Sequence, residues 1–203
     1  MKLRHSPISP FVRKVKLAAH VLGFAHELEF VETKTMADND PILTVNPLGK
    51  IPALEYEGVT LYDSRVIVEY FDAKAGGGKI IPASGTSRFE TLTRAALMEG
   101  ILDAAILIVY EGRMRPPEKF VDSFVNYQRA KIQRSLSKIA LLPLKYQNGA
   151  TPDVAEITLA CVLDYLDFRQ ILNWRDHAAD LEPWLESFAI MVPGYEETLP
   201  RDT

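Results

Sequence analysis

Residues 51–70 read IPALEYEGVTLYDSRVIVEY, and this stretch decides the fold class. It contains two short strand-like runs, Ile51–Tyr56 and Val59–Leu61, separated by a residue pair that has the length of a hairpin turn. Asp63 or Ser64 then opens a helix, because short polar side chains are preferred at the N-cap. The stretch therefore predicts a β-hairpin followed by a helix, which is typical of a small α/β domain.

The residues before this stretch add a strand, a helix and a second strand. Lys2–His5 is predicted as a short strand, and His26–Glu32 alternates as a half-buried strand does. Between them, Ser9-Pro10 indicates a helix start, with serine at the N-cap and proline at the first helical position. Gly23 is the expected helix stop. The basic residues of this helix are expected largely on the side opposite its apolar stripe: Arg13, Lys14, Lys16 and His20.

Only helical patterns follow the triple glycine at 76–78, which is the strongest break in the chain. The pattern that begins at Asp153 has the spacing of a capping box, and its interior is apolar nearly all round, which predicts a helix at the centre of a bundle. The expected helices cover 86–113, 117–142, 153–170 and 181–191, after an irregular polar segment at 36–46. We predict an α/β domain over 1–76, a linker over 77–85 and an all-helical domain over 86–203.

Composition narrows the functional class. The chain has 203 residues and a formal net charge of −4, which argues against a general nucleic-acid-binding surface. Cys161 is the single cysteine, so no intrachain disulfide forms, which fits a reducing compartment. No apolar run approaches the roughly 20 residues that span a bilayer. The histidines show no metal-ligand spacing. We therefore expect a cytoplasmic protein with no membrane, nucleic-acid or metal partner.

Several motifs occur together in one order. Ser9-Pro10 stands at a helix start, GKIPAL occupies 49–54 and LYDSRVIVEY occupies 61–70, while DVAEITLACVLDYLDFR occupies 153–169 and EPWLESFAIMVPGYEETLP occupies 182–200. In this combination the chain resembles the glutathione S-transferase family over essentially its whole length. The resemblance implies a thioredoxin-like N-terminal domain joined to a helical-bundle C-terminal domain. The segments SPFVRKV and DSRVIVEY are most similar to a bacterial branch whose physiological substrates are largely unassigned.

The resemblance implies that Ser9 is the catalytic residue of a transferase that activates the thiol of glutathione. A free thiol with a pKa near 8.5 is only about 3% ionised at pH 7. A serine hydroxyl and the positive end of a helix both favour the thiolate, and Ser9 is placed to supply both. Ser6 is the competing hydroxyl, and a plain N-cap is the other interpretation of Ser9. Serine instead of cysteine favours transferase or isomerase chemistry over thiol–disulfide exchange, because serine does not attack a disulfide.

The resemblance also implies the glutathione-binding residues. The Ile51-Pro52 bond is cis in the family, and the residue before the proline pairs its backbone with the cysteinyl part of the ligand. Asp63 and Ser64 would hold the γ-glutamyl end, and Lys50 would meet the glycyl carboxylate, with Lys34 as a further candidate. As residues taken singly, Asp63-Ser64 also fits an ordinary helix cap, and the two lysines also fit solvated loop positions.

The second substrate would bind between the domains, near Tyr110 and Arg113 at the end of the first long helix. Arginine there also fits a favourable interaction with the helix dipole, without any ligand. The family resemblance further implies a homodimer, in which Arg65 is available for an ion pair between chains. The alternatives to a transferase are a glutathione-dependent isomerase and a non-catalytic binding or protein-interaction member of the same fold. The sequence does not name the electrophile.

Overall fold

A four-stranded mixed sheet forms the centre of the N-terminal part. The computed structural model describes residues 1–142, 144 and 150–201. The strand order is β2-β1-β3-β4, and the bounds are Lys2–His5 for β1, Glu29–Glu32 for β2, Ala53–Tyr56 for β3 and Val59–Leu61 for β4. β1 runs parallel to β2 and antiparallel to β3, and β3 and β4 form the predicted hairpin. Glu57 and Gly58 both have positive φ, at 49° and 80°, as a two-residue hairpin turn requires.

Two helices accompany this sheet. They are α1, Pro10–Val21, and α3, Ser64–Lys74, and they pack against each other. Both begin where the sequence predicts, because Ser9 and Asp63 cap them with their side chains. Two local predictions were wrong. The segment 36–46 contains a short helix, α2, Ile42–Val45, and the predicted strand at His26–Glu32 begins with the 3-10 turn Ala25–Glu27.

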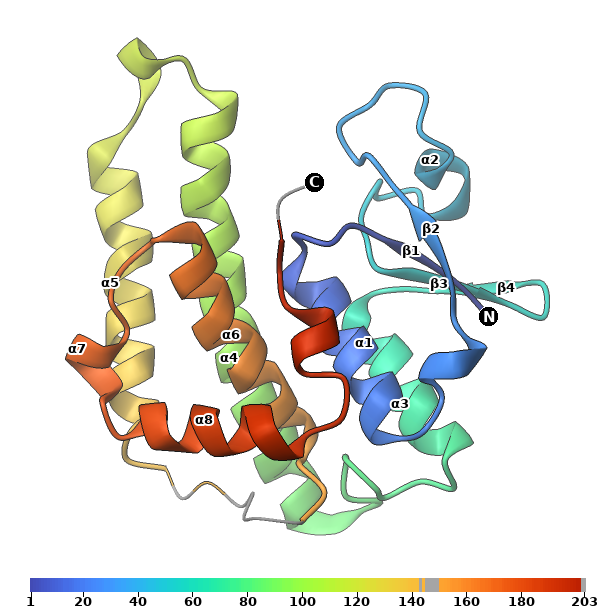
Figure 1. The fold of residues 1–203 in the computed structure, drawn as a ribbon. Coiled ribbons are helices and arrows are strands. Elements are labelled where there is room, and N and C mark those ends of the chain that lie inside the picture. The colour runs from blue at the N-terminus through green and yellow to red at the C-terminus, as the bar shows by residue number, and fades with distance from the viewer. Residues whose placement is uncertain (143, 145–149, 202–203) are drawn as a thin grey trace.

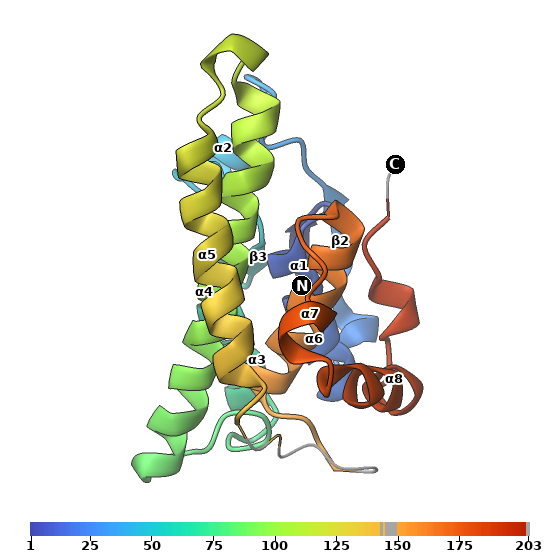
Figure 2. The same ribbon diagram turned by 90° about the vertical axis from the view of Figure 1, so that its left-hand side faces the viewer.

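The described residues of the C-terminal part form helices joined by loops, with no strand among them, and together the two parts give the predicted fold (Figure 1). Its helices are α4, Gly85–Met114; α5, Asp122–Ile139; α6, Val154–Arg169; α7, Arg175–Ala178; and α8, Leu181–Met191. Figure 2 shows α4 and α5 side by side as a long hairpin. The helix predicted over 117–142 is shorter, because residues 117–119 form a 3-10 turn after Pro116. The sequence also did not predict α7.

Helix α6 is the buried centre, as its apolar interior predicts. Every residue from Val154 to Leu163 is buried, and α6 packs against both α4 and α1. The predicted capping box is present at its start. Asp153 Oδ1 accepts from the backbone N–H groups of Ala155 and Glu156 at 3.0 and 3.1 Å, and Glu156 Oε2 accepts from Asp153 N at 2.9 Å.

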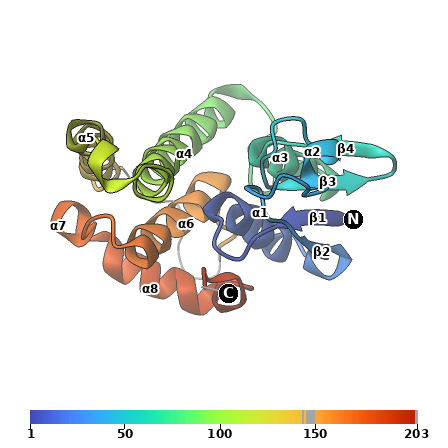
Figure 3. The same cartoon turned by 90° about the horizontal axis from the view of Figure 1, so that it is seen from above.

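The side of α1 opposite its apolar stripe is not wholly open to solvent, because two of its basic residues are buried. Arg13 is 3% exposed and Lys14 is 0% exposed. The reason is that α1 lies between α3 and α6, so two of its sides are covered (Figure 3). Buried charges need partners, and the partners of Arg13 and Lys14 come from the helical part of the chain.

The connection between the two parts is held by one buried carboxylate. Asp72 at the end of α3 accepts from the backbone N–H groups of Gly78, Lys79 and Ile80 at 2.8 to 2.9 Å. Ile80 O in turn accepts from Val154 N at 2.9 Å, which ties the connection to the start of α6. The division into domains over 1–76 and 86–203 stays a prediction.

Candidate functional site

The N-terminus of α1 presents Ser9 in the geometry of an N-cap. Ser9 has φ −85° and ψ 119°, and its Oγ accepts from Val12 N at 3.3 Å. Since Oγ acts as the acceptor in this cap, the hydroxyl hydrogen of Ser9 stays free to donate elsewhere. Ser9 N also donates to Ser6 O at 3.2 Å, so both candidate hydroxyls belong to one tight turn. The choice between Ser9 and Ser6 stays a prediction.

The segment Lys50–Pro52 lies before β3. The Ile51-Pro52 peptide bond is cis, as the family resemblance implies. Asn46, which is 1% exposed, donates from Nδ2 to Lys50 O at 2.8 Å and accepts from Leu48 N at 3.0 Å. Asn46 therefore fixes the loop that presents this segment. Our sequence reasoning missed Asn46, although the Asn-Pro pair at 46–47 is a recognised turn signal.

The N-terminus of α3 carries the predicted acidic-serine pair. Asp63 is exposed and its Oδ1 accepts from Arg65 N at 2.9 Å, so it acts as the helix cap. Ser64 is the first residue of the helix and is buried. The first turn of a helix offers unpaired N–H groups that favour an anion such as an α-carboxylate. The capping role of Asp63 and a ligand-binding role are compatible, because its second carboxylate oxygen stays available.

A buried cluster of charges ties these elements together. Glu99 of α4 is 3% exposed and accepts from both Lys14 of α1 and Arg65 of α3. Burial lowers the pKa of Lys14, and the neighbouring Glu99 opposes this effect. Asp103 lies one turn further along α4, within electrostatic reach of Arg65 and Lys50. Its partial burial raises the pKa of its carboxyl group. The helix starts that carry Ser9 and Ser64 are thus fixed relative to α4.

Two of the predicted lysines extend into solvent. Lys34 and Lys50 are both exposed. Lys34 follows β2, and its backbone N donates to Asp40 Oδ2 at 2.7 Å. A backbone group of each residue is thus hydrogen-bonded within its loop, while the side chains are exposed.

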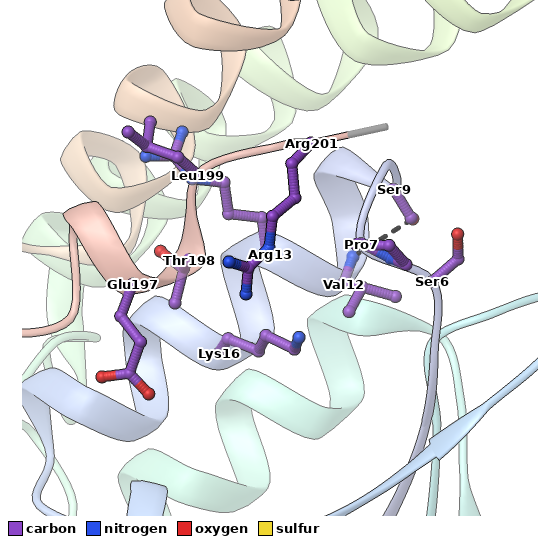
Figure 4. Close-up of a pocket in the computed structure, with 10 residues that line it drawn as sticks. All are labelled: Ser6, Pro7, Ser9, Val12, Arg13, Lys16, Glu197, Thr198, Leu199 and Arg201. Atoms are coloured by element: carbon purple, nitrogen blue, oxygen red, sulfur yellow. Dashed lines mark hydrogen bonds between the residues drawn. The ribbon is translucent and has the colours of Figure 1, made fainter. Parts of the chain in front are cut away.

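A pocket opens beside Ser9, between α1 and the C-terminal segment (Figure 4). Its walls come from the β1–α1 loop, from one side of α1 and from residues 197–199 and 201. The lining side chains include Ser6, Ser9, Arg13, Lys16, Glu197 and Arg201. None of the last four was singled out as a site residue from the sequence, because they become neighbours only when the C-terminal segment folds back over α1.

The predicted second-substrate residues lie elsewhere. Tyr110 and Arg113 are exposed near the end of α4, within electrostatic reach of Tyr165 on α6. Burial raises the pKa of the Tyr165 hydroxyl. Neither Tyr110 nor Arg113 is among the described residues that line the pocket beside Ser9. The structure thus separates two surfaces that a second substrate could use.

Cys161 is a buried structural thiol. It is 1% exposed in the middle of α6, and burial raises the pKa of its thiol to about 11. A thiol in such surroundings is inert as a nucleophile at neutral pH. Within residues 1–142, 144 and 150–201, no group of three or more metal-binding side chains comes together. In the same part of the chain, no helix has the length and apolar character needed to cross a membrane.

Comparison with known proteins gives a consistent result. Residues 3–79 match the family described as glutathione S-transferase, N-terminal domain. The uncharacterized GST-like protein YibF of Escherichia coli (strain K12) is 32% identical over 202 residues, which cover 95% of this chain and 98% of that protein.

Solved structures show the same similarity. A glutathione transferase family member from Pseudomonas fluorescens Pf-5, with bound S-(propanoic acid)-glutathione, is 37% identical and covers 100% of both chains with a TM-score of 0.87. A glutathione S-transferase from Methylobacillus flagellatus KT with glutathione bound is 32% identical, with a TM-score of 0.88 over 98% of this chain and 99% of that chain.

Proposed function

This chain belongs to the glutathione S-transferase family, and we propose that it is a cytoplasmic transferase that joins glutathione to small electrophiles. The observation that carries the proposal is the geometry of Ser9. Its Oγ accepts the capping bond from Val12 N, which leaves the hydroxyl proton to donate at the mouth of a pocket. A detoxifying role fits this chemistry.

Thiol activation is the central task of such an enzyme. Lowering the thiol pKa by about two units requires roughly 2.7 kcal/mol of preferential stabilisation of the thiolate. A charge-assisted hydrogen bond from Ser9 supplies part of it, and the positive end of α1 supplies more. The thiol proton leaves to solvent. The sulfur then forms a bond to an electrophilic carbon, and the leaving group departs with the electron pair of the broken bond.

Glutathione would lie across the elements that the buried Glu99 cluster holds together. The backbone of Ile51, before the cis Pro52, would pair with the cysteinyl part of the ligand. Asp63 would pair with the α-amino group, and Ser64 with the first-turn N–H groups would receive the α-carboxylate. The glycyl carboxylate would lie near Lys50 or Lys34. Glutathione bound to relatives of similar fold supports this assignment.

The second substrate would approach Ser9 from the helical part of the chain, with Tyr110 and Arg113 as further candidates on that side. No metal takes part in the proposed reaction.

A homodimer is part of the proposal. Exposed apolar side chains project from α3 and α4, with Val66 46% exposed, Phe89 68% exposed and Leu107 42% exposed. Burial of such residues against a second copy is favourable. Arg65 pairs with Glu99 within its own chain, so the apolar residues carry the argument. Light scattering should give about twice 22.8 kDa. A monomer with full activity would contradict the dimer.

The experiment that tests the function compares Ser9→Ala with Ser6→Ala. Two quantities are measured: the pKa of the bound thiol, from the ultraviolet absorbance of the thiolate, and the rate with an aromatic halide. Ser9→Ala should raise that pKa and lower the rate by more than about tenfold, since one pKa unit corresponds to a factor of ten in thiolate. Ser6→Ala should change both far less.

The other outcomes are equally informative. The reverse ranking of the two variants would move the catalytic role to Ser6. Calorimetry with glutathione, combined with a turnover screen of the unmodified protein, decides between an enzyme and a binding module. Tight glutathione binding without turnover of any electrophile in a broad screen would favour the non-catalytic alternative. Absence of both binding and turnover would refute the proposed function.

A further inference from the structure

The pocket beside Ser9 is unusually basic for a protein with a net charge of −4. Arg13, Lys16 and Arg201 line it, and Glu197 is the one carboxylate among its described lining residues. Figure 4 shows the Glu197 carboxylate on the side of the pocket away from Ser9. It lies 3.8 Å from Nε2 of His20, outside the pocket. The part of the pocket near Ser9 is therefore lined by hydroxyls and cations.

Lys16 is held in this pocket without a paired carboxylate. Its Nζ lies 3.3 Å from His5 Nδ1 and 4.4 Å from the centre of the Phe30 ring. Burial, and then the Lys16 charge, lower the pKa of His5 to about 4, so the ring is neutral at pH 7 and its Nδ1 can accept from Lys16. Within the described part of the chain, Lys16 and Arg201 form no ion pair.

Lys16 and Arg201 lie close enough to repel each other. Burial lowers the pKa of Lys16, the charge of Arg201 lowers it further, and Glu197 only partly opposes the two effects. Two neighbouring cations of this kind are unfavourable in the empty pocket. An anion placed between them would relieve the repulsion and would gain charge-assisted hydrogen bonds.

Arg13 adds unused donors at the inner wall. Its Nη1 donates to Asp164 Oδ2 at 2.5 Å, and Tyr195 donates to the same carboxylate at 2.8 Å. Its Nε and Nη2 are buried without a hydrogen-bond partner among the described residues, although the residue is 3% exposed. Buried donors are normally satisfied, so two orphaned donors in one guanidinium indicate a missing acceptor.

We propose that this pocket binds a carboxylate on the second substrate, so that the preferred electrophiles are small organic acids. The inference rests on the proposed function, because Ser9 is both the partner of the thiolate and part of the pocket wall. The pocket has an accessible volume of about 10 Å³, so a short acidic chain attached at the sulfur would place its carboxylate at the opening of the pocket, next to Lys16 and Arg201.

The test compares two glutathione conjugates of the same shape, S-carboxyethyl-glutathione and its neutral amide, S-carbamoylethyl-glutathione. Calorimetry measures the affinity of the full chain for each conjugate and for glutathione itself. The carboxylate should bind at least about tenfold more tightly than the amide, which corresponds to about 1.4 kcal/mol. Added salt should reduce this preference, since part of it comes from charge attraction.

Two variants assign the preference to the pocket. Lys16→Met and Arg201→Gln should each reduce the ratio of the two affinities severalfold and leave glutathione affinity within about twofold. Lys138→Met, the same change at an exposed lysine of α5, is the matched control and should change nothing. Lys16→Met removes a side chain that packs on the Phe30 ring. Arg201 is exposed near the chain end, so we expect Arg201→Gln to fold and to test the pocket independently of Lys16→Met.

Each other outcome overturns the inference in a distinguishable way. Equal affinity for the acid and the amide, with glutathione still bound, refutes the carboxylate pocket and leaves the proposed function intact. An equal loss of affinity for glutathione and both conjugates in the variants assigns the pocket to the tripeptide. No binding of glutathione by the unmodified protein refutes both proposals.

Discussion

Replacement of Glu99 by glutamine is the sharpest test of how the two parts of the chain are held together. Glu99 is 3% exposed and Lys14 is 0% exposed, so Glu99→Gln leaves a buried ammonium without its counter-charge. Removing one member of a buried pair costs about 3–5 kcal/mol, because the remaining charge stays desolvated. The second partner, Arg65, is 59% exposed and can return to water, so it adds little.

The expected loss is therefore about 3 kcal/mol in the free energy of unfolding. Urea denaturation at one fixed protein concentration measures it, and the midpoint should fall by about 1 to 2 M. Glu90→Gln is the matched control, since Glu90 is an exposed residue of the same helix. That control should stay within about 0.5 kcal/mol of the unmodified protein.

A compensating variant separates lost charge from damaged packing. Lys14→Met combined with Glu99→Leu replaces the pair by apolar side chains of similar length, and such replacements are often neutral or stabilising. The double variant should therefore recover most of the stability that Glu99→Gln loses. If Glu99→Gln costs less than about 1 kcal/mol, or if the double variant is no better than the single one, the reasoning is refuted.

The pH dependence has a definite sign. Burial already lowers the folded-state pKa of Lys14 below its ordinary 10.5. Between the folded-state and unfolded-state values, the unfolded chain binds more protons, so stability rises with pH in that window. Loss of Glu99 removes the opposing attraction, which lowers the folded-state pKa further. In Glu99→Gln the rise of stability with pH should therefore begin at a lower pH than in the unmodified protein.

Two further predictions concern single hydrogen-bonding side chains. Asn46→Ala removes the hydrogen bond to Lys50 O, so it should weaken glutathione binding, measured by calorimetry, while the melting temperature falls only slightly. An unchanged affinity would contradict the role of Asn46 in fixing this loop. Asp153→Ala removes the cap of α6 and should lower the free energy of unfolding, measured by urea denaturation, by about 1–2 kcal/mol, whereas Asp153→Asn should keep most of that stability. Equal losses in both variants would show that the ion pair between Asp153 and Arg94 matters more than the cap.

Local features of the fold were predictable from neighbouring residues alone. The hairpin at Glu57-Gly58 and the starts of α1, α3 and α6 depend on turn and capping chemistry within a few positions. The burial of α6 was also predictable, because a helix that is apolar on every side has no face for water. Helix α7 was missed because its four residues, 175–178, are too few to show a helical period.

For the candidate site, the sequence and the family resemblance predict roles for Ser9, Pro52, Asp63 and Ser64, since each belongs to a compact motif, and these roles stay predictions. Only the tertiary structure decided which charged residues are buried and what they meet. Lys14 pairs with Glu99, which is 85 positions away in the sequence, and Lys16 lines the same pocket as Arg201 from the C-terminal segment. The physical reason is that capping and turn preferences act within one or two turns, whereas desolvation and charge pairing depend on which helices pack around a residue.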